Sequence, residues 1–234
     1  MPDEYVALDL EMTGLRVKED RIIEIGAVLV EKGRITETFS SFVNPRCRLP
    51  ERIMQITHIT QAEVDGAPEL GEILTPLSEF IGSRALLGHR ILSDFSFLKR
   101  AFVNAGMTFE KEGIDTLMLA RKFLQDLPSK RLSDACAHYG IFMQAHRAIS
   151  DAEAAHLLYE RLKAEFCTEE TAAQFEAKPL LYKIKKEAPA SKKQKERLLF
   201  LIEKHKLYIP IDLESMTKNE VSRLTDQILA KHGR

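Results

Sequence analysis

Cysteine is scarce in this chain, and its few cysteines form no recognisable pattern. Cys47, Cys136 and Cys167 are odd in number and far apart, with no Cys-x-x-Cys pair and no nearby histidine at zinc-finger spacing. This spacing argues against a zinc finger and against a disulfide framework. We interpret the three residues as reduced thiols.

Long apolar runs and internal repeats are also absent. No stretch approaches the roughly 20 apolar residues that a membrane span needs. The chain starts Met1-Pro2-Asp3-Glu4, which is acidic where a secretory signal would be basic and then apolar. We therefore expect a globular protein that has no membrane partner and lies in the cytoplasm.

The net charge of −1 hides an uneven distribution of charge along the 234 residues. Residues 1–177 hold 20 basic and 28 acidic residues, whereas residues 178–234 hold 14 basic and 7 acidic residues. The composition predicts a large domain over 1–177, a lysine-rich linker over 178–192 and a small helical module over 193–234. A module of that size has little core of its own.

Hydrophobic periodicity predicts a mixed α/β architecture for the large domain. Three strands are expected first, over 5–11, 21–30 and 35–43, followed by a short buried strand at 85–88. A loop is expected from Asn44-Pro45, and the capping box Thr60-Gln61-Ala62-Glu63 then predicts a helix start. Further helices are expected over 69–81, from about Asp94, and over 116–123, 132–139 and 151–166. The order indicates a mixed sheet flanked by helices. In the basic tail, two amphipathic helices are expected, the second starting at the capping box Thr217-Lys218-Asn219-Glu220.

Two acidic residues lie close together on the first predicted strand. Asp9 and Glu11 alternate with apolar residues on the first strand, so both side chains lie on one face of it. Like charges held that close raise each other's pKa values, and a divalent cation removes the cost. Carboxylates without cysteine ligands suit Mg²⁺ or Mn²⁺, and two such ions about 4 Å apart can act on a phosphodiester.

A histidine and a further aspartate stand together later in the chain. His146 lies five residues before Asp151 in His146-Arg147-Ala148-Ile149-Ser150-Asp151-Ala152. Ser150-Asp151-Ala152-Glu153 fits a capping box, which predicts Asp151 in the first turn of a helix and His146 on the loop before it. A histidine there is suited to accept a proton from water near neutral pH.

Three ordered motifs resemble those of the DnaQ-like, DEDDh-type 3′→5′ exonucleases, a group that includes the proofreading subunit of bacterial DNA polymerase III. The motifs are 9–15, 89–94 and 146–152, and the resemblance covers residues 5 to about 165. It implies an RNase H-like fold with a five-stranded mixed sheet. Met12, Arg90 and Ser93 depart from the family pattern without removing an acidic position.

The resemblance also implies roles for individual residues. Asp9, Glu11, Asp94 and Asp151 would hold two Mg²⁺ or Mn²⁺ ions, and His146 would be the general base. The residues expected at the terminal nucleotide are Thr13, Gly14, Leu15, His58 and His89. For His89, a structural hydrogen bond is an equally good interpretation, because a histidine after a buried strand commonly makes one.

The expected reaction is metal-dependent 3′→5′ exonucleolysis that releases nucleoside 5′-monophosphates, with single-stranded DNA favoured as the substrate. An exoribonuclease of the same fold is one alternative. Another is a nucleic-acid-binding or polymerase-tethering module in which catalysis is secondary. A DNA polymerase is accordingly a candidate partner, and the basic tail would contact either nucleic acid or that partner.

Overall fold

The computed structural model describes residues 4–144, 146–209, 211–214 and 216–233, and contacts divide the chain into two compact units. The larger unit contains the residues up to Pro45 together with Leu49–Ile184, and the smaller contains Arg46–Arg48 together with the residues from Lys185 onward. The boundaries that composition suggested at 177 and 192 stay a prediction.

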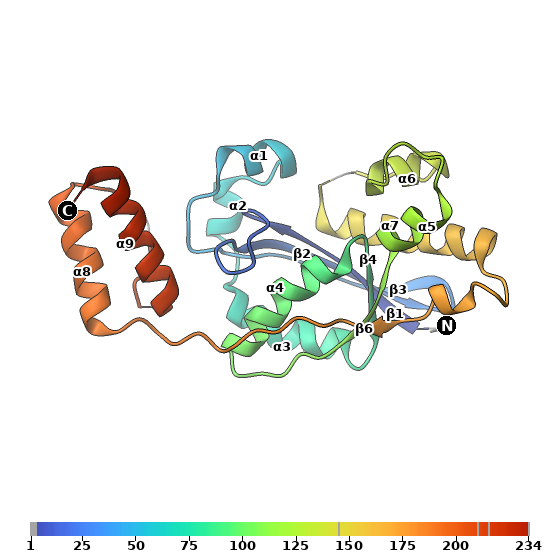
Figure 1. Cartoon of the computed structure of the whole chain (residues 1–234), viewed down its shortest axis with the longest axis horizontal. Coiled ribbons are helices and arrows are strands. Elements are labelled where there is room, and N and C mark those ends of the chain that lie inside the picture. Colours follow the sequence, from blue (N-terminus) through green and yellow to red (C-terminus); the bar gives the residue numbers. More distant parts are fainter. Residues whose placement is uncertain (1–3, 145, 210, 215, 234) are drawn as a thin grey trace. The chain divides into compact units, whose positions relative to one another are not determined.

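A mixed six-stranded sheet of order β3-β2-β1-β4-β5-β6 forms the centre of the larger unit (Figure 1). Strands β1, β2 and β3 form an antiparallel meander, whereas β4 and β5 run parallel to β1. The short β6 pairs antiparallel with β5 and adds a strand to the expected five. The bounds are Glu4–Met12 for β1, Ile22–Glu31 for β2, Arg34–Phe42 for β3, Ala85–Gly88 for β4, Glu112–Asp115 for β5 and Lys178–Pro179 for β6.

Helices cover both faces of this sheet, which confirms the predicted α/β class. The apolar face of β1 packs Val6, Leu8 and Leu10 against α3 and α4. The opposite face packs Tyr5 and Ala7 against α5, α6 and α7. The bounds are Leu70–Ile81 for α3, Ile91–Asn104 for α4, Thr116–Phe123 for α5, Leu132–His138 for α6 and Ala148–Phe166 for α7.

Two short helices precede α3, and the first of them lies in the stretch expected to be a loop. These are α1 (Glu51–Thr57) and α2 (Gln61–Asp65), and their apolar residues form a small cluster around Ile23, Leu49, Ile59 and Val64. Helix α2 starts at the predicted capping box, where the Thr60 side chain accepts from the Glu63 N–H and Glu63 accepts from the Thr60 N–H. Helix α1 has no side-chain cap, so no capping motif in the sequence marked its start. A single 3₁₀ turn, Ala172–Gln174, follows α7.

The smaller unit is a pair of helices, α8 (Lys192–Lys204) and α9 (Lys218–His232), which lie side by side (Figure 1). Both start at capping boxes, centred on Ser191 and on the predicted Thr217. Their core is limited to a few buried residues, which are Ala190, Leu198, Leu201, Val221 and Ile228. In the described part of the chain, no helix is both long and apolar enough to cross a membrane.

Candidate active site

The two carboxylates of β1 lie on the face of the sheet that α7 covers. Asp9 pairs with Gly26 of β2, and Glu11 pairs with Glu24 two positions further along the same ladder. The alternation of β1 places Asp9 and Glu11 with Tyr5 and Ala7, on the opposite face from the apolar residues that pack against α4. The sequence pattern therefore assigned their face of the strand correctly.

Gly26 allows α7 to lie directly on the sheet beside these carboxylates. A Cβ atom at this position would lie 2.1 Å from the Ile149 backbone nitrogen and 2.2 Å from the Ala148 carbonyl carbon. No side chain fits there without a shift of the helix or the strand. This close approach brings the first turn of α7, and with it Asp151, to Asp9 and Glu11.

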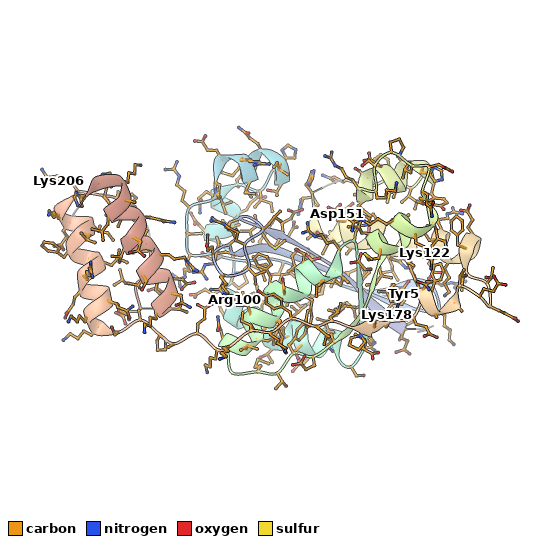
Figure 2. All side chains as sticks on the ribbon, in the orientation of Figure 1. Tyr5, Arg100, Lys122, Asp151, Lys178 and Lys206 are labelled. Carbon is orange, nitrogen blue, oxygen red and sulfur yellow. The ribbon has the colours of Figure 1, made fainter. Side chains whose placement is uncertain are left out.

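Asp151 lies in that first turn, as the motif predicted, but the helix starts three residues earlier than expected (Figure 2). Ser150 and Asp151 are therefore not part of a capping box and instead hold the preceding loop. The Ser150 hydroxyl accepts from the Gln144 N–H at 3.0 Å, and the Asp151 Oδ2 accepts from the His146 N–H at 3.2 Å. The capping-box prediction was wrong because both side chains reach back to the loop rather than forward to the helix.

His146 has an exposed side chain and a left-handed backbone with φ of 66°. Its ring comes close to two carboxylates: one potential ligand atom from each of Glu11, His146 and Asp151 lies within 4.8 Å of the others. The structure thus brings together one residue from the first motif and two from the third. Such a group could either bind a cation or transfer a proton.

Asp94 belongs to another element, the first turn of α4, and is buried. Helix α4 starts at Ile91 rather than near Asp94, directly after Arg90 with φ of 77°. The Arg90 N–H donates to Asp115 Oδ1 at 3.0 Å, which holds the turn between β4 and α4. Repulsion from Asp94 is the largest charge effect on Asp9, so the two carboxylates share one site.

The pKa values of all four carboxyl groups are raised, in each case first by burial. For Asp9, repulsion from Asp94, Asp151 and Glu11 adds to burial and moves the pKa well above its ordinary value. Burial and then repulsion from Asp151 raise the pKa of Glu11 to about 8, and burial raises the pKa of Asp151 to about 6. The pKa of Asp94 is also raised well above the ordinary value by burial.

These features fit a divalent cation. The buried Oδ1 of Asp151 has no hydrogen-bond partner, although buried polar atoms are normally paired. Oxygen donors from several carboxylates, with no thiol among them, suit hard ions such as Mg²⁺ and Mn²⁺. A bound cation would supply the missing partner of Asp151 and relieve the repulsion that raises the carboxyl pKa values.

An ion pair between Glu24 and Arg147 fixes the start of α7, and no motif pointed to Glu24 as the partner. Glu24 is 1% exposed and accepts from Arg147 Nη2 at 3.0 Å, from Arg147 Nε at 3.2 Å and from the Ala148 N–H at 3.1 Å. The guanidinium of Arg147 also lies 5.3 Å from the centre of the Phe42 ring. One signal was available: a charged residue within the apolar run of β2 requires a buried partner.

The residues expected at the terminal nucleotide, apart from His89, lie in two places. Thr13, Gly14 and Leu15 follow β1 in a turn closed by hydrogen bonds between Thr13 and Arg21, and Leu15 is 70% exposed. His58 ends α1 and lines a cavity of about 290 Å³, together with Phe42, Thr57, Ile59, Glu63, Gln144 and Arg147. Both residue groups stay predictions as substrate contacts.

His89 is engaged by protein groups through both ring nitrogens. Its Nδ1 lies 2.9 Å from the Thr116 hydroxyl, and its Nε2 lies 2.8 Å from the Lys130 carbonyl oxygen. Burial lowers the pKa of this imidazole, which favours its neutral form. This geometry matches the structural interpretation of His89, while a substrate contact by it stays a prediction.

The family is decided by a match to the exonuclease family model RNase_T over residues 6–159. The chain belongs to this exonuclease family. The matched region contains all three motifs, from Asp9 in β1 to Asp151 in α7. The predicted resemblance to DnaQ-like exonucleases is confirmed, and so is the assignment to the nuclease hydrolases.

The curated relatives that this exonuclease region matches are much larger proteins. It is 40% identical over 153 residues to the PolC-type DNA polymerase III of Clostridium perfringens, covering 65% of this chain and 11% of that protein. It is 38% identical over 164 residues to the PolC-type DNA polymerase III of Oceanobacillus iheyensis, covering 68% of this chain and 11% of that protein. The chain thus spans about a tenth of the length of these relatives.

Solved structures with the same fold include exonucleases in complex with nucleic acid. E. coli exonuclease I in a zinc-bound complex with single-stranded DNA matches with a TM-score of 0.62 and 19% identity, over 70% of this chain and 41% of that one. Exonuclease X bound to 5′ overhanging duplex DNA matches with a TM-score of 0.56 and 25% identity, over 73% of this chain and 98% of that one. A 3′-exonuclease that recognises a histone mRNA stem-loop matches with a TM-score of 0.57 and 19% identity, over 70% of this chain and 83% of that one.

Proposed function

We propose that this protein is a 3′→5′ exonuclease that removes nucleoside 5′-monophosphates one at a time from a single strand. The observation that carries the proposal is the convergence of Asp9, Glu11, Asp94 and Asp151 beside His146, inside a domain of the exonuclease family. Asp9, Glu11, Asp94 and Asp151 are the residues that would hold two Mg²⁺ or Mn²⁺ ions. When bound, such ions stabilise the attacking and departing oxygens of a phosphodiester.

The chain's own residues supply the proton transfer and the orientation of the base. In the proposed step, a water oxygen forms a bond to the terminal phosphorus, and His146 accepts the proton that the water loses. The bond from phosphorus to the 3′ oxygen breaks, and that oxygen keeps the electron pair and takes a proton from solvent to become the new 3′-hydroxyl. The backbone N–H of His146 donates to Asp151, which keeps the proposed base beside the carboxylate cluster. The exposed setting of His146 leaves its ring accessible to a substrate.

Single-stranded DNA is the favoured substrate, and RNA is the second candidate. The PolC-type relatives are DNA polymerases, and two of the similar structures hold DNA, which supports a DNA substrate. The histone mRNA 3′-exonuclease shares the same fold, which supports RNA instead. We expect a contact that distinguishes ribose from deoxyribose at the turn after β1 or at the cavity beside His58.

A DNA polymerase is the protein partner that the relatives favour. The matched region in them is part of a DNA polymerase III of PolC type, so association of this domain with a polymerase is consistent with their architecture. The competing function, a tethering module with secondary catalysis, is less well supported. A module of that kind has no need for four carboxylates with raised pKa values around a histidine.

The test is product analysis with 3′- and 5′-end-labelled DNA and RNA oligonucleotides of one sequence, in Mg²⁺, Mn²⁺ or EDTA. We expect metal-dependent release of mononucleotides from the 3′ end, lost in Asp94→Asn, with the deoxyribose strand cleaved faster. Products that start from the 5′ end, or cleavage that persists in EDTA, would contradict the proposal. Faster cleavage of the ribose strand would identify an exoribonuclease.

A further inference from the structure

Helix α8 of the smaller unit exposes an aromatic ring that its small core does not need. Phe200 is 61% exposed, whereas Leu198 and Leu201 on the other side of the same helix are buried against α9. Tyr208, which follows α8 in the connection to α9, is 94% exposed. An exposed aromatic ring offers a flat face on which a nucleic-acid base can stack.

Three cations share the helix face of Phe200. Lys193, Arg197, Phe200 and Lys204 follow each other at spacings of four, three and four residues, which places them within about 60° around the helix axis. All four side chains are exposed. Lys193 and Arg197 make no ion pair with any residue in the described part of the chain. We call these four residues the α8 stripe.

The surroundings of the α8 stripe remain positively charged. Residues 185–234 hold twelve basic and seven acidic residues, which gives a net charge of +5. Lys206, just beyond the C-terminal end of α8 (Figure 2), adds a further exposed cation near this end of the stripe. Cations of α8 that point elsewhere are already paired, since Lys192 bridges to Glu196 and Lys195 bridges to Glu214 at 2.6 Å.

We propose that the α8 stripe binds a single strand of nucleic acid. Lys193, Arg197 and Lys204 contact successive phosphates, and Phe200 stacks on a base between them. This combination of a cationic track with an aromatic platform is how proteins bind single strands without reading their sequence. The class of ligand rests on the proposed exonuclease function, whereas the binding surface is independent of the active site.

Other occupants fit the α8 stripe less well. A membrane-bound helix needs a broad apolar face, but Phe200 has Glu196 and Glu203 as its i−4 and i+3 neighbours. The core of a protein interface is poor in lysine, but two lysines and an arginine accompany the single aromatic residue here. The arrangement of charges therefore favours a polyanion with exposed bases.

The test compares two matched pairs of variants of the full chain. Binding of fluorescent single-stranded DNA and RNA 16-mers is measured by anisotropy in EDTA, which prevents cleavage. Phe200→Ala should weaken binding about tenfold, the effect of losing one stacked base, and Phe200→Tyr should restore it. Leu199→Ala removes an apolar side chain that is 44% exposed on the same helix but off the stripe, and should change binding less than twofold.

Charge is tested with Arg197→Gln against Lys231→Gln, an exposed cation in the last turn of α9. Arg197→Gln should reduce the slope of log K against log salt by about 0.7, the value for one phosphate contact on a single strand, and Lys231→Gln should leave it unchanged. Equal effects of Phe200→Ala and Leu199→Ala on binding would overturn the proposal, and so would equal effects of Arg197→Gln and Lys231→Gln on the salt slope. Phe200-dependent binding to phosphatidylserine vesicles without binding to either oligonucleotide would also overturn it.

Hydrolysis of a dinucleotide in Mg²⁺ separates this proposal from the proposed function. A dinucleotide is too short to reach beyond the active site, so Phe200→Ala should cleave it at the wild-type rate. Failure of the wild type to cleave any substrate, with Phe200-dependent binding retained, would remove the exonuclease function alone. Cleavage of the dinucleotide with no contribution from Phe200 to the binding of long strands would remove the α8 proposal alone.

Discussion

Glu11→Gln should stabilise the metal-free protein at pH 8, although it removes a residue proposed for catalysis. Burial and repulsion from Asp151 raise the pKa of Glu11 from its ordinary value of 4.5 to about 8. Below pH 4.5 the carboxyl group is protonated in the folded and the unfolded chain alike. Between pH 4.5 and pH 8 the folded protein keeps a proton that the unfolded chain has released, so the free energy of unfolding falls as pH rises.

The size of the effect follows from the same interval. Each pH unit corresponds to about 1.4 kcal/mol, which gives an upper bound of about 4–5 kcal/mol at pH 8. Water reaches the partly exposed Glu11, so we expect about 2 kcal/mol. Glutamine keeps the shape of the side chain without its charge, so the variant should be more stable than the wild type by about that amount at pH 8 and equally stable at pH 4.

Urea unfolding in EDTA, measured from pH 4 to pH 8 for both proteins, provides the assay. The same series in Mg²⁺ should reverse the order at pH 8, because the wild type gains binding free energy at the cation site and the variant gains less. A Glu11→Gln protein that is less stable than the wild type at pH 8 without metal would refute the reasoning. So would a difference between the two proteins that does not change with pH.

Three further substitutions test the supports of the site. Gly26→Ala forces a Cβ to within 2.1 Å of the α7 backbone, so it should lower the free energy of unfolding by about 2–3 kcal/mol and slow cleavage. Gly71→Ala, whose Cβ would have nothing within 4 Å, should do neither. Thermal unfolding and cleavage rates of the two variants provide the comparison. Arg147→Ala leaves Glu24 buried with one remaining donor, the Ala148 N–H, and should lower the free energy of unfolding by about 2–3 kcal/mol. This is less than for a fully buried pair, because the Arg147 side chain is 37% exposed. A loss below about 0.5 kcal/mol in urea unfolding would contradict the role of the pair. His146→Gln should slow cleavage by about 10²- to 10⁴-fold, with stability changed by less than about 0.5 kcal/mol, and single-turnover rates near those of the wild type would exclude His146 as the base.

The local sequence determined the features that depend on neighbours along the chain. Alternation in β1 placed Asp9 and Glu11 on one face, and the capping boxes at Thr60 and Thr217 located the starts of α2 and α9. These features follow from the fixed geometry of strands and helix ends. The three ordered motifs also sufficed to identify the family, which the exonuclease family model confirms.

Tertiary structure decided whatever depends on residues far apart in the sequence. Helix α7 starts at Ala148 because Glu24, 124 residues earlier, accepts its first N–H, and Gly26 lets it lie on the sheet. The residues from Ser150 fit a capping box, but these long-range contacts start the helix three residues earlier. The added strand β6 likewise arises from pairing with β5, which no local pattern specifies. The sequence by itself thus determined the family and the placement of Asp9 and Glu11 on one strand face. The packing of α7 on β2 decided how Asp151 and His146 reach them, because burial and charge pairing act through space rather than along the chain.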